Sequence, residues 1–430
     1  MNYIELNNQV IIRDENGKYQ LNKDKEALKS YLEDYIEPKM KKFDNLKDRL
    51  NYLVENDYYS KEILDLYDQY VIDVIYDFIR AKNFKFQSYM SASKFYQNYA
   101  LKSNDGEEIL ENYEDKVLIV ALTLGNGEPK LAKDIAEKLI NQEFQPATPT
   151  FLNAGRARGG KMVSCFLVNV EDSCEGISYA VSSANHLSKI GGGVALNLTR
   201  LRASGESIKG IKGAAGGVMG VAKLLEQSFS YFNQMGARQG AGAVYLNVLH
   251  PDFETLLDSK KINADEKIRL TTLSIGAIIP DKFMELAEKN EKCYAFYPHS
   301  IYQKYGVHLD GIKMDEWYDK LANDDEIEKK EINPRELLTR IAQTQQESGY
   351  PYVVFIDSAN EQHTLKDVGM IKMSNLCCEI FQYQTPSDIK GYGQVSDWGQ
   401  DISCNLGSLN IANVMDNKDI EKTIDVAIRA

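Results

Sequence analysis

The chain has 430 residues and a formal net charge of −13, from 50 basic and 63 acidic side chains. That length exceeds what one hydrophobic core usually supports, so we expect one large domain and a smaller one. An acidic surface disfavours nucleic acid as a partner, because such binding needs basic side chains to displace counterions. The sequence contains no apolar run of the roughly 20 residues that cross a bilayer, and its six cysteines are too few for a disulfide scaffold. We therefore expect a cytoplasmic protein without a membrane partner.

The first third of the chain is predicted to be helical, from residue 22 to about residue 145. Residues 60–83 carry apolar side chains at helical spacing, with Ser60 as the expected N-cap. Residues 129–143 repeat this periodicity and open with a proline, which is favoured in a first helical turn. These patterns predict a helical N-terminal domain over residues 1–145.

The pattern changes after this region, where short β-rich runs alternate with helical and glycine-rich segments. The predicted strands cover residues 163–169, 193–198, 243–248, 272–280 and 350–357. The intervening helices include residues 174–190 and 217–235. Alternation of this kind indicates an α/β domain with a largely parallel sheet, here over residues 146–430.

Two adjacent cysteines, Cys377 and Cys378, stand out in the stretch "SNLCCEI". A disulfide between neighbouring residues is strained. Zinc is normally held by paired cysteine or histidine clusters, and the five scattered histidines offer none, so we predict no metal site. The structural alternative is that both cysteines are buried and pack as small apolar side chains.

The neighbours of these cysteines add a second possibility. If the segment is extended, Asn375, Cys377 and Glu379 point to one side, whereas Leu376 and Cys378 point to the other. An amide, a thiol and a carboxyl group would then share one small volume. Spacing alone leaves both alternatives open.

The stretch "NLCCEI" resembles the Asn-x-Cys-x-Glu finger-loop motif of class I ribonucleotide reductase large subunits. Four further stretches resemble that family in the same order, namely residues 145–173, 188–210, 236–252 and 401–415. The short region before "PATPTF" is most similar to class Ib, because no ATP-binding cone is recognisable there. The resemblance implies a helical N-terminal domain followed by the first half of a ten-stranded α/β barrel, with a central finger loop at about 372–382.

The resemblance also implies a reaction centre in the finger loop. Cys377 would become a thiyl radical and remove the 3′ hydrogen of a ribonucleoside diphosphate. Glu379 would accept the proton of the 3′ hydroxyl, which requires only a positioned carboxylate. Asn375 would hydrogen-bond the substrate hydroxyls. Cys378 departs from the family pattern, which has another small or apolar residue there, and we expect it to pack away from the substrate.

A reducing pair and two substrate contacts are implied outside the finger loop. Cys165 and Cys404 match the pair that protonates the departing 2′ hydroxyl and ends as a disulfide, which a thioredoxin- or glutaredoxin-like protein then reduces. Ser164 and Thr148 match positions that contact the substrate. For Thr148 an ordinary turn role in "ATPT" remains an alternative.

An allosteric nucleotide site is implied as well, for a deoxynucleotide or ATP effector. The residues that match its contacts are Asp172, Arg202, Lys209, Arg238 and Gln239. The glycine-rich residues 210–217 match the loop around the effector phosphates, where glycine permits close backbone approach. Asp172 is also expected to be the N-cap of the following helix, in a capping box with Glu175.

The resemblance implies partners as well. No cofactor binds the large subunit directly; the radical comes from a small (beta) subunit with a dinuclear metal centre, and the complete large subunit is expected to be a homodimer. Relatives continue beyond the point where "NKDIEKTIDVAIRA" ends this sequence. We therefore expect the N-terminal portion of a split or interrupted large subunit, inactive without a complementary C-terminal half.

Two alternatives to this function stay in view. The first is a non-catalytic fragment that keeps the effector site but never assembles a reaction centre. The second is a cobalamin-dependent reductase, which uses the same cysteines without a small subunit. Its finger loop usually begins Asn-Pro-Cys-Gly-Glu, so "NLCCE" argues against it.

Overall fold

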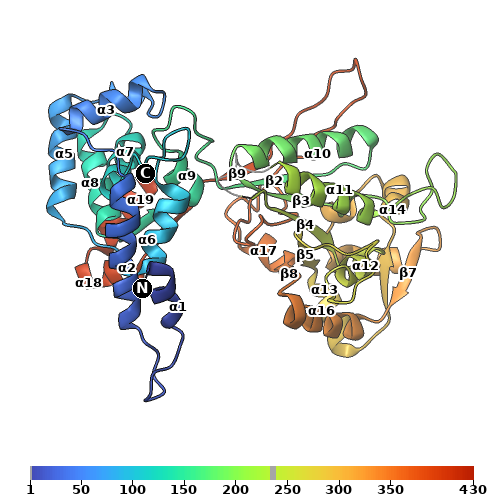
Figure 1. The fold of residues 1–430 in the computed structure, drawn as a ribbon. Coiled ribbons are helices and arrows are strands. Elements are labelled where there is room, and N and C mark those ends of the chain that lie inside the picture. Colours follow the sequence, from blue (N-terminus) through green and yellow to red (C-terminus); the bar gives the residue numbers. More distant parts are fainter. Residues whose placement is uncertain (1, 233–238) are drawn as a thin grey trace. The chain divides into compact units, whose positions relative to one another are not determined.

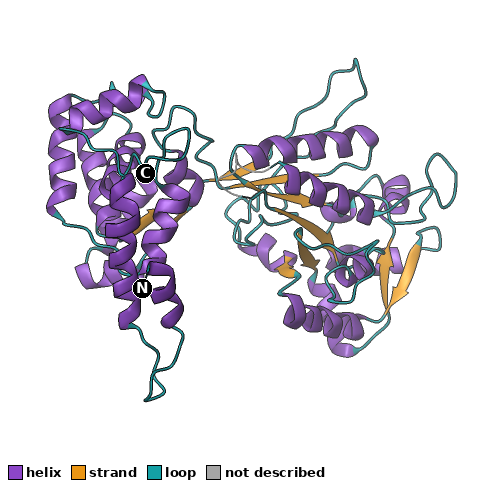
Figure 2. Cartoon of the chain, viewed as in Figure 1, coloured by secondary structure: helices purple, strands orange, loops and turns teal. Residues whose placement is uncertain are grey.

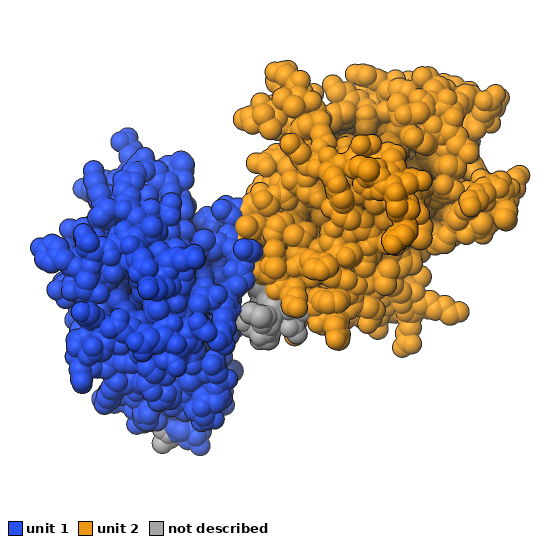
Figure 3. Space-filling view, turned by 90° about the horizontal axis from the view of Figure 1, so that it is seen from above, with its two compact units in different colours: residues 1–162, 405–430 blue, residues 163–404 orange. Residues whose placement is uncertain are grey.

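The computed structural model describes residues 2–232 and 239–430 and divides into two compact units (Figure 1). The first unit contains residues 1–162 and 405–430, and the second contains residues 163–404 (Figure 3). The predicted boundary after residue 145 falls within strand β1 (Phe144–Pro146) of the first unit, whereas the contacts divide the chain after Met162.

The first unit is helical, as predicted (Figure 2). Its α-helices are α1 (Tyr3–Gln9), α2 (Asn22–Ser30), α3 (Leu46–Glu55), α4 (Lys61–Leu64), α5 (Gln69–Ala81), α6 (Tyr89–Lys94), α7 (Tyr113–Gly125), α8 (Pro129–Ile140), α9 (Thr148–Asn153), α18 (Ile411–Asn417) and α19 (Ile420–Arg429). Helix α7 is buried on nearly every side, which fits its continuous run of apolar residues. A capping box between Asn112 and Asp115 begins this helix, and Asn126 ends it in the left-handed conformation. None of the helices in the described residues is long and apolar enough to cross a membrane.

The prediction of one helix over residues 60–83 is wrong. The chain forms two helices there, α4 and α5, separated by a turn. Tyr67 lies in that turn, and its hydroxyl donates to the carbonyl of Leu122 at 2.9 Å and accepts from the amide of Gly127 at 2.8 Å. Burial of this hydroxyl against α7 therefore interrupts the helical pattern. Ser60 precedes α4 but its side chain makes no capping hydrogen bond.

Residues 405–430 join the first unit through a short sheet and a buried ion pair. Strand β10 (Gly407–Leu409) pairs antiparallel with β1. The ammonium of Lys138 lies 2.7 Å from Glu143 and 2.8 Å from Asp419, and its side chain is almost fully buried. A buried cation is costly unless it is paired, so these two carboxylates attach the end of the described chain to α8.

The second unit is built on a six-stranded sheet with strand order β8-β5-β4-β3-β2-β9. The strands are β2 (Cys165–Asn169), β3 (Gly193–Asn197), β4 (Gly242–Asn247), β5 (Ser274–Ile279), β8 (Tyr352–Phe355) and β9 (Ile402–Cys404). The first five are parallel to one another, and β9 pairs antiparallel with β2. The predicted strands and the largely parallel sheet are therefore confirmed.

Helices and a small hairpin surround this sheet. The helices are α10 (Cys174–Lys189), α11 (Val218–Tyr231), α12 (Phe253–Asp258), α13 (Asp281–Lys289), α14 (Pro298–Tyr305), α15 (Met314–Ala322), α16 (Pro334–Ser348) and α17 (Ile356–Gln362), and the hairpin pairs β6 (Cys293–Phe296) with β7 (Lys329–Ile332). Helices α10 and α11 agree with the two predicted helices. In Figure 1 both run along one face of the sheet.

The two faces of the sheet have different partners. Along β4, Val244 and Leu246 belong to the large core that the helices cover, whereas Ala243 and Tyr245 belong to a second, smaller cluster. Strands buried on both faces are typical of parallel sheets and explain their continuous apolar sequences. The smaller cluster includes Met373, so the second face of the sheet receives the predicted finger loop.

Candidate active site

The finger loop, residues 372–382, packs against the sheet face that the helices leave open. Leu376, Cys378 and Ile380 are partly buried against the apolar cluster of that face. Gly193, the first residue of β3, makes room for the loop, because a Cβ atom there would lie 2.6 Å from Cδ2 of Leu376. The absence of a side chain at Gly193 therefore allows the loop to pack at the amino-terminal ends of the strands.

The segment is not extended, the condition on which the predicted sidedness rested, because Asn375 folds it into a turn. The amide of Cys378 donates to the carbonyl of Asn375 at 3.1 Å, and Cys378 has a φ of 63°. Oδ1 of Asn375 accepts from the amides of Glu379 at 2.9 Å and Ile380 at 3.0 Å, a local capture that asparagine side chains favour. The predicted separation is found for Cys377 and Glu379, which are exposed, and for Cys378, which is half-buried, but Asn375 is buried and does not share their side.

The buried side chain of Asn375 also joins the finger loop to the sheet. Its Nδ2 atom donates to Oε1 of Glu379 at 2.6 Å and to Sγ of Cys165 at 3.2 Å. The hydroxyl of Tyr245 donates to the Asn375 carbonyl at 2.6 Å. Sequence reasoning missed Tyr245, although one hydroxyl in the apolar strand "AVYLNV" was the available signal. Burial raises the pKa of this tyrosine, which keeps the hydroxyl protonated as a donor.

Cys165 and Cys404 lie directly opposite each other on neighbouring strands, β2 and β9. None of the six cysteines, all of which the structure describes, forms a disulfide. The hydrogen bond with Cys165, together with burial, raises the pKa of the Cys404 thiol. Cys404 is therefore protonated at neutral pH and able to donate a proton.

Ser164 stands beside this cysteine pair. Its amide donates to the carbonyl of Cys404 at 2.9 Å. Its hydroxyl oxygen is buried and has no hydrogen-bond partner among the described residues. Buried hydroxyl groups normally have a partner, so this atom is suited to a polar ligand at the cysteine pair.

The two adjacent cysteines have different surroundings. Cys378 packs as predicted, and its Sγ lies 3.7 Å from the carbonyl of Val353. Burial raises the pKa of the Cys378 thiol. Cys377 lies near Tyr352, whose pKa is raised by burial, by Tyr350 and in smaller part by Cys377. The described residues contain no cluster of three or more metal-ligating side chains.

Thr148 is the one predicted site residue that belongs to the first unit. It is the first residue of α9, and its Oγ1 lies 3.0 Å from the hydroxyl of Tyr99. The alternative of an ordinary turn residue is therefore wrong, because Thr148 begins a helix. Its contact with a substrate stays a prediction.

The predicted effector residues Asp172 and Arg202 form an ion pair. Nε of Arg202 donates to Oδ2 of Asp172 at 2.6 Å, and the Arg202 amide donates to Oδ1 at 3.2 Å. The prediction that Asp172 caps α10 is wrong. Ser173 is the N-cap, and its hydroxyl accepts from the amide of Gly176 at 2.9 Å. The carboxylate of Asp172 is instead turned toward Arg202, at the carboxyl end of β2.

A cavity of ≈ 280 Å³ opens beside this ion pair. It is lined by Asp172, Ser173, Cys174, Ile177, Leu201, Arg202, Ile208, Ala215, Gly216, Gly217 and Val221. Gly217 has a φ of 70°, and a Cβ atom there would lie 2.3 Å from Oδ2 of Asp252. Gly217 thus packs tightly against Asp252, and Ala215, Gly216 and Gly217 line the cavity together with Asp172. Contact of the glycine-rich segment with an effector phosphate stays a prediction.

Two further predicted effector residues, Lys209 and Gln239, do not line this cavity. Lys209 is exposed, has a φ of 51° and is absent from the cavity lining. Gln239 is exposed as well. Arg238 lies outside the described residues. Of the predicted effector residues, the structure thus brings Asp172 and Arg202 to one cavity, together with residues 215–217 of the glycine-rich segment.

Comparisons with known proteins agree with this fold. Residues 3–84 match the family described as ribonucleotide reductase N-terminal, and residues 85–159 match the ribonucleotide reductase all-alpha domain. Residues 163–430 match the ribonucleotide reductase barrel domain. The start of the barrel-domain match at residue 163 coincides with the start of the second compact unit.

Several curated relatives are similar over most of the chain. The ribonucleoside-diphosphate reductase subunit alpha of Bacillus subtilis is 52% identical over 425 residues, which is 99% of this chain and 61% of the relative. The subunit alpha of Mycoplasma genitalium is 44% identical over 429 residues, or 100% of this chain and 58% of the relative. That of Synechocystis is 34% identical over 328 residues, or 74% of this chain and 41% of the relative.

The chain thus spans about three fifths of the length of its more similar relatives. The three family matches together cover residues 3–159 and 163–430, which is nearly all of the chain. The chain belongs to the ribonucleotide reductase large (alpha) subunit family.

Proposed function

We propose that this chain carries the thiyl-radical cysteine and the reducing thiols of a class Ib ribonucleoside-diphosphate reductase. The observation that supports this most is the position of the Asn375 amide, which bonds both Glu379 and Cys165. It brings the finger loop, with Cys377 on its outer side, to the strand that pairs Cys165 with Cys404. A thiol for hydrogen abstraction, a carboxylate and two further thiols are then available at one end of one sheet.

The first step uses the two exposed residues of the finger loop. The Cys377 thiyl radical takes the 3′ hydrogen atom of the ribose, which restores the thiol and leaves a carbon radical. Glu379 accepts the proton of the 3′ hydroxyl as a general base. Asn375 already bonds this carboxylate, so it orients the base and can share the ribose hydroxyls with it.

The second step uses the cysteine pair. One thiol protonates the 2′ hydroxyl, which leaves as water, and the two sulfurs together supply two electrons and two protons and end as a disulfide. Cys377 then returns a hydrogen atom to the 3′ carbon, which regenerates the thiyl radical. The overall change is one ribonucleotide and two thiols to one deoxyribonucleotide, one disulfide and one water. The raised pKa of Cys404 means that this thiol still carries its proton when the step begins. The unpartnered hydroxyl of Ser164 would bind the substrate next to it.

The proposal includes partners that supply what these residues lack. A radical-generating small subunit would oxidise Cys377, and a thioredoxin- or glutaredoxin-like protein would reduce the Cys165–Cys404 disulfide. A second polypeptide corresponding to the remaining part of the relatives would complete the enzyme. The cavity at Asp172 would bind a deoxynucleotide or ATP effector.

Mild oxidation tests the cysteine pair in this chain by itself. We expect diamide to convert Cys165 and Cys404 into an intramolecular disulfide, because directly opposed residues of antiparallel strands have the spacing that a disulfide requires. Peptide mapping under non-reducing conditions would detect it, and Cys404→Ser would remove it. Cys293→Ser, at a buried cysteine of the same unit, is the matched control and should leave it intact. Preferential linkage of Cys377 to Cys378 would contradict the assignment.

Nucleotide titration tests the effector site. We expect Asp172→Ala to weaken dATP binding about tenfold, because a hydrogen bond to a charged group is lost and Arg202 loses its partner. Isothermal titration calorimetry measures the change. Glu175→Ala removes the same charge from an exposed position three residues away and should leave the affinity within about twofold. Equal affinities for all three proteins would argue against the site.

Co-expression decides between the proposed enzyme and the non-catalytic alternative. Deoxynucleotide formation by this chain together with the missing C-terminal half and a small subunit would support the enzyme. Persistent inactivity of that mixture, with dATP still bound at Asp172, would support a fragment that binds effector only. Activity that required adenosylcobalamin instead of the small subunit would support the cobalamin-dependent alternative.

A further inference from the structure

A buried ion network lies at the carboxyl ends of the strands, opposite the cysteines. Arg200 follows β3, and its Nε atom lies 2.9 Å from both carboxylate oxygens of Asp310. Its Nη1 atom bonds Glu171, which follows β2. The side chains of Arg200 and Asp310 are 5% and 2% exposed. Sequence reasoning singled out none of these three residues.

Asp310 is the centre of this network. It lies in a short 3₁₀ turn, Leu309–Gly311, and Oδ2 also accepts from Nδ2 of Asn197 at 3.1 Å. Burial by itself would raise the pKa of Asp310, but Arg200 and Lys372 outweigh burial and lower it. The carboxylate is therefore charged at neutral pH and attracts more than one cation.

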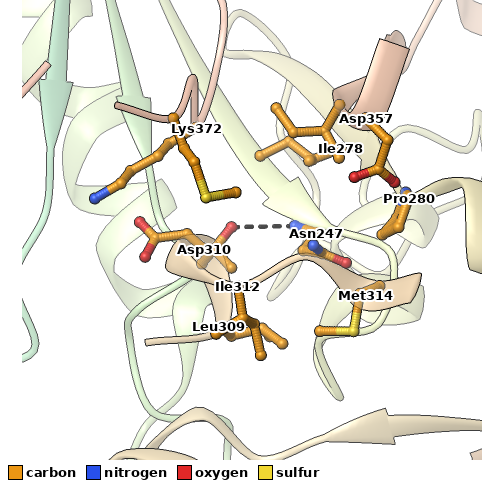
Figure 4. Close-up of a pocket in the computed structure, with 12 residues that line it drawn as sticks. Asn247, Ile278, Pro280, Leu309, Asp310, Ile312, Met314, Asp357 and Lys372 are labelled. Carbon is orange, nitrogen blue, oxygen red and sulfur yellow. Dashed lines mark hydrogen bonds between the residues drawn. The ribbon is translucent and has the colours of Figure 1, made fainter. Parts of the chain in front are cut away.

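Lys372, the first residue of the finger loop, is the second cation. It lines the same small cavity as Asp310, and Figure 4 shows the two charged ends directed to the same side of that cavity. The cavity holds ≈ 20 Å³, about enough for one water molecule, and Asn247 and Asp357 offer further polar groups. Burial lowers the pKa of Lys372, whereas the attraction of Asp310 opposes that effect.

The rest of the loop base is held by groups without charge. Oδ1 of Asn360 accepts from the amide of Ile371 at 2.8 Å, and its Nδ2 donates to the Ile371 carbonyl at 3.0 Å. Met373 is buried, and the hydroxyl of Ser374 donates to the carbonyl of Ile380 at 2.9 Å. Lys372 is thus the one charged side chain among these base residues, 371–374, all of which the structure describes.

The other end of the network reaches the predicted effector site. Glu171 precedes Asp172. A second cavity, of ≈ 370 Å³, is lined by Glu171 and Arg200 together with Asp172 and Arg202. The Asp172–Arg202 pair also lines the cavity of ≈ 280 Å³ described above. A ligand that contacts the Asp172–Arg202 pair therefore lies one residue from the ion pair that holds Asp310. Ion pairs join Glu171, Arg200 and Asp310, and the small cavity that Asp310 and Lys372 both line is the remaining step to the finger loop.

We propose that Asp310 is a positioning residue that holds the base of the finger loop through Lys372 and links it, through Arg200 and Glu171, to the nucleotide cavity at Asp172. This link deepens the proposed function, on which its effector part rests. Its consequence is that loss of the Lys372 charge loosens the loop that carries Cys377 without altering the cysteine site directly.

Hydrogen–deuterium exchange of this chain without ligand tests the positioning role. We expect Lys372→Met to speed exchange of the amides of residues 373–380 about fivefold. Lys372→Arg should keep exchange slow, because it keeps the positive charge. Lys372→Met keeps an apolar stem of similar length, so packing of the stem alone would not produce this difference between the two variants. Asp310→Asn should have the same effect as Lys372→Met, and the double variant should add little to it.

Matched controls make the test decisive. Lys366→Met removes an exposed positive charge from the segment before the loop and should not alter exchange of residues 373–380. If Lys372→Met left the exchange unchanged, or if Lys366→Met accelerated it equally, the proposal would be overturned. Lys372→Met leaves the Arg200–Asp310 pair in place, so its folding does not depend on the outcome for Asp310→Asn.

A dATP titration then tests the link to the nucleotide cavity. In the natural chain we expect saturating dATP to slow exchange of residues 373–380, and Lys372→Met to reduce that slowing about fivefold, since coupling between two sites is reciprocal. Equal slowing in both proteins would overturn the link. A chain that bound no dATP would refute the effector site of the proposed function, whereas faster exchange in unliganded Lys372→Met would still support the positioning role.

Discussion

Replacing Cys377 by serine should abolish deoxynucleotide formation, with a loss of at least about 10⁴-fold, as expected when a group essential to the chemistry is removed. The O–H bond of serine is too strong for a radical at that atom to form or to be regenerated. The turn around residue 377 is held by Asn375 and by backbone amides. The measurement is conversion of CDP to dCDP by this chain co-expressed with the missing C-terminal half and a small subunit.

The adjacent cysteine is the matched control for this prediction. Cys378→Ala removes one sulfur from the same loop, but that sulfur packs against the sheet and contacts the Val353 carbonyl. We expect its turnover to remain within about threefold of the natural protein, at a stability cost of about 1 kcal/mol for the lost packing. If Cys378→Ala were the inactive variant and Cys377→Ser retained activity, the reactive sulfur would be the other one.

Replacing Glu111 by alanine should destabilise the first unit by about 3–5 kcal/mol, the cost of breaking a buried charge network. Glu111 is fully buried, and it accepts from the Tyr59 hydroxyl at 2.5 Å and the Leu101 amide at 2.7 Å. The cations of Lys116 and Arg156 each lie 3.9 Å away. The truncation would leave these groups without their shared acceptor. Chemical denaturation followed by tyrosine fluorescence would measure the loss.

The Lys116 side chain explains why this effect should be large. It is 0% exposed, and burial lowers its pKa to about 7. Without Glu111 the ammonium would lose the carboxylate that opposes this burial penalty. Glu107→Ala, at an exposed position in the same loop, should change the free energy of unfolding by less than about 0.5 kcal/mol. Equal effects of the two substitutions would mean that the buried network contributes nothing.

Local sequence patterns predicted most of the regular structure. Helix α8 follows from the periodicity of residues 129–143 and its leading proline, and β3 and β4 follow from short apolar runs between glycine-rich segments. Such patterns succeed because an α-helix or a buried strand satisfies its backbone hydrogen bonds by a regular rule. Residues 60–83 failed because a distant carbonyl and amide capture the Tyr67 hydroxyl.

The finger loop shows the same division at the scale of one site. Its composition predicted that Cys377 and Cys378 face opposite ways, and that is observed. Its backbone was not predictable as extended or turned, because the outcome depends on whether the Asn375 side chain captures the amides of Glu379 and Ile380. That capture is favoured where Asn375 is buried beside Cys165 and Tyr245, which are distant in the sequence.

By itself, then, the sequence determined the element types, the order of the motifs and the identity of the residues that carry reactive groups. Only the tertiary structure decided which of those groups meet. The pairing of Cys165 with Cys404 and the ion network of Glu171, Arg200 and Asp310 join segments from different strands and loops. The physical reason is range: helical and strand periodicity act between neighbours along the chain, whereas thiol pairs and buried charges act between neighbours in space.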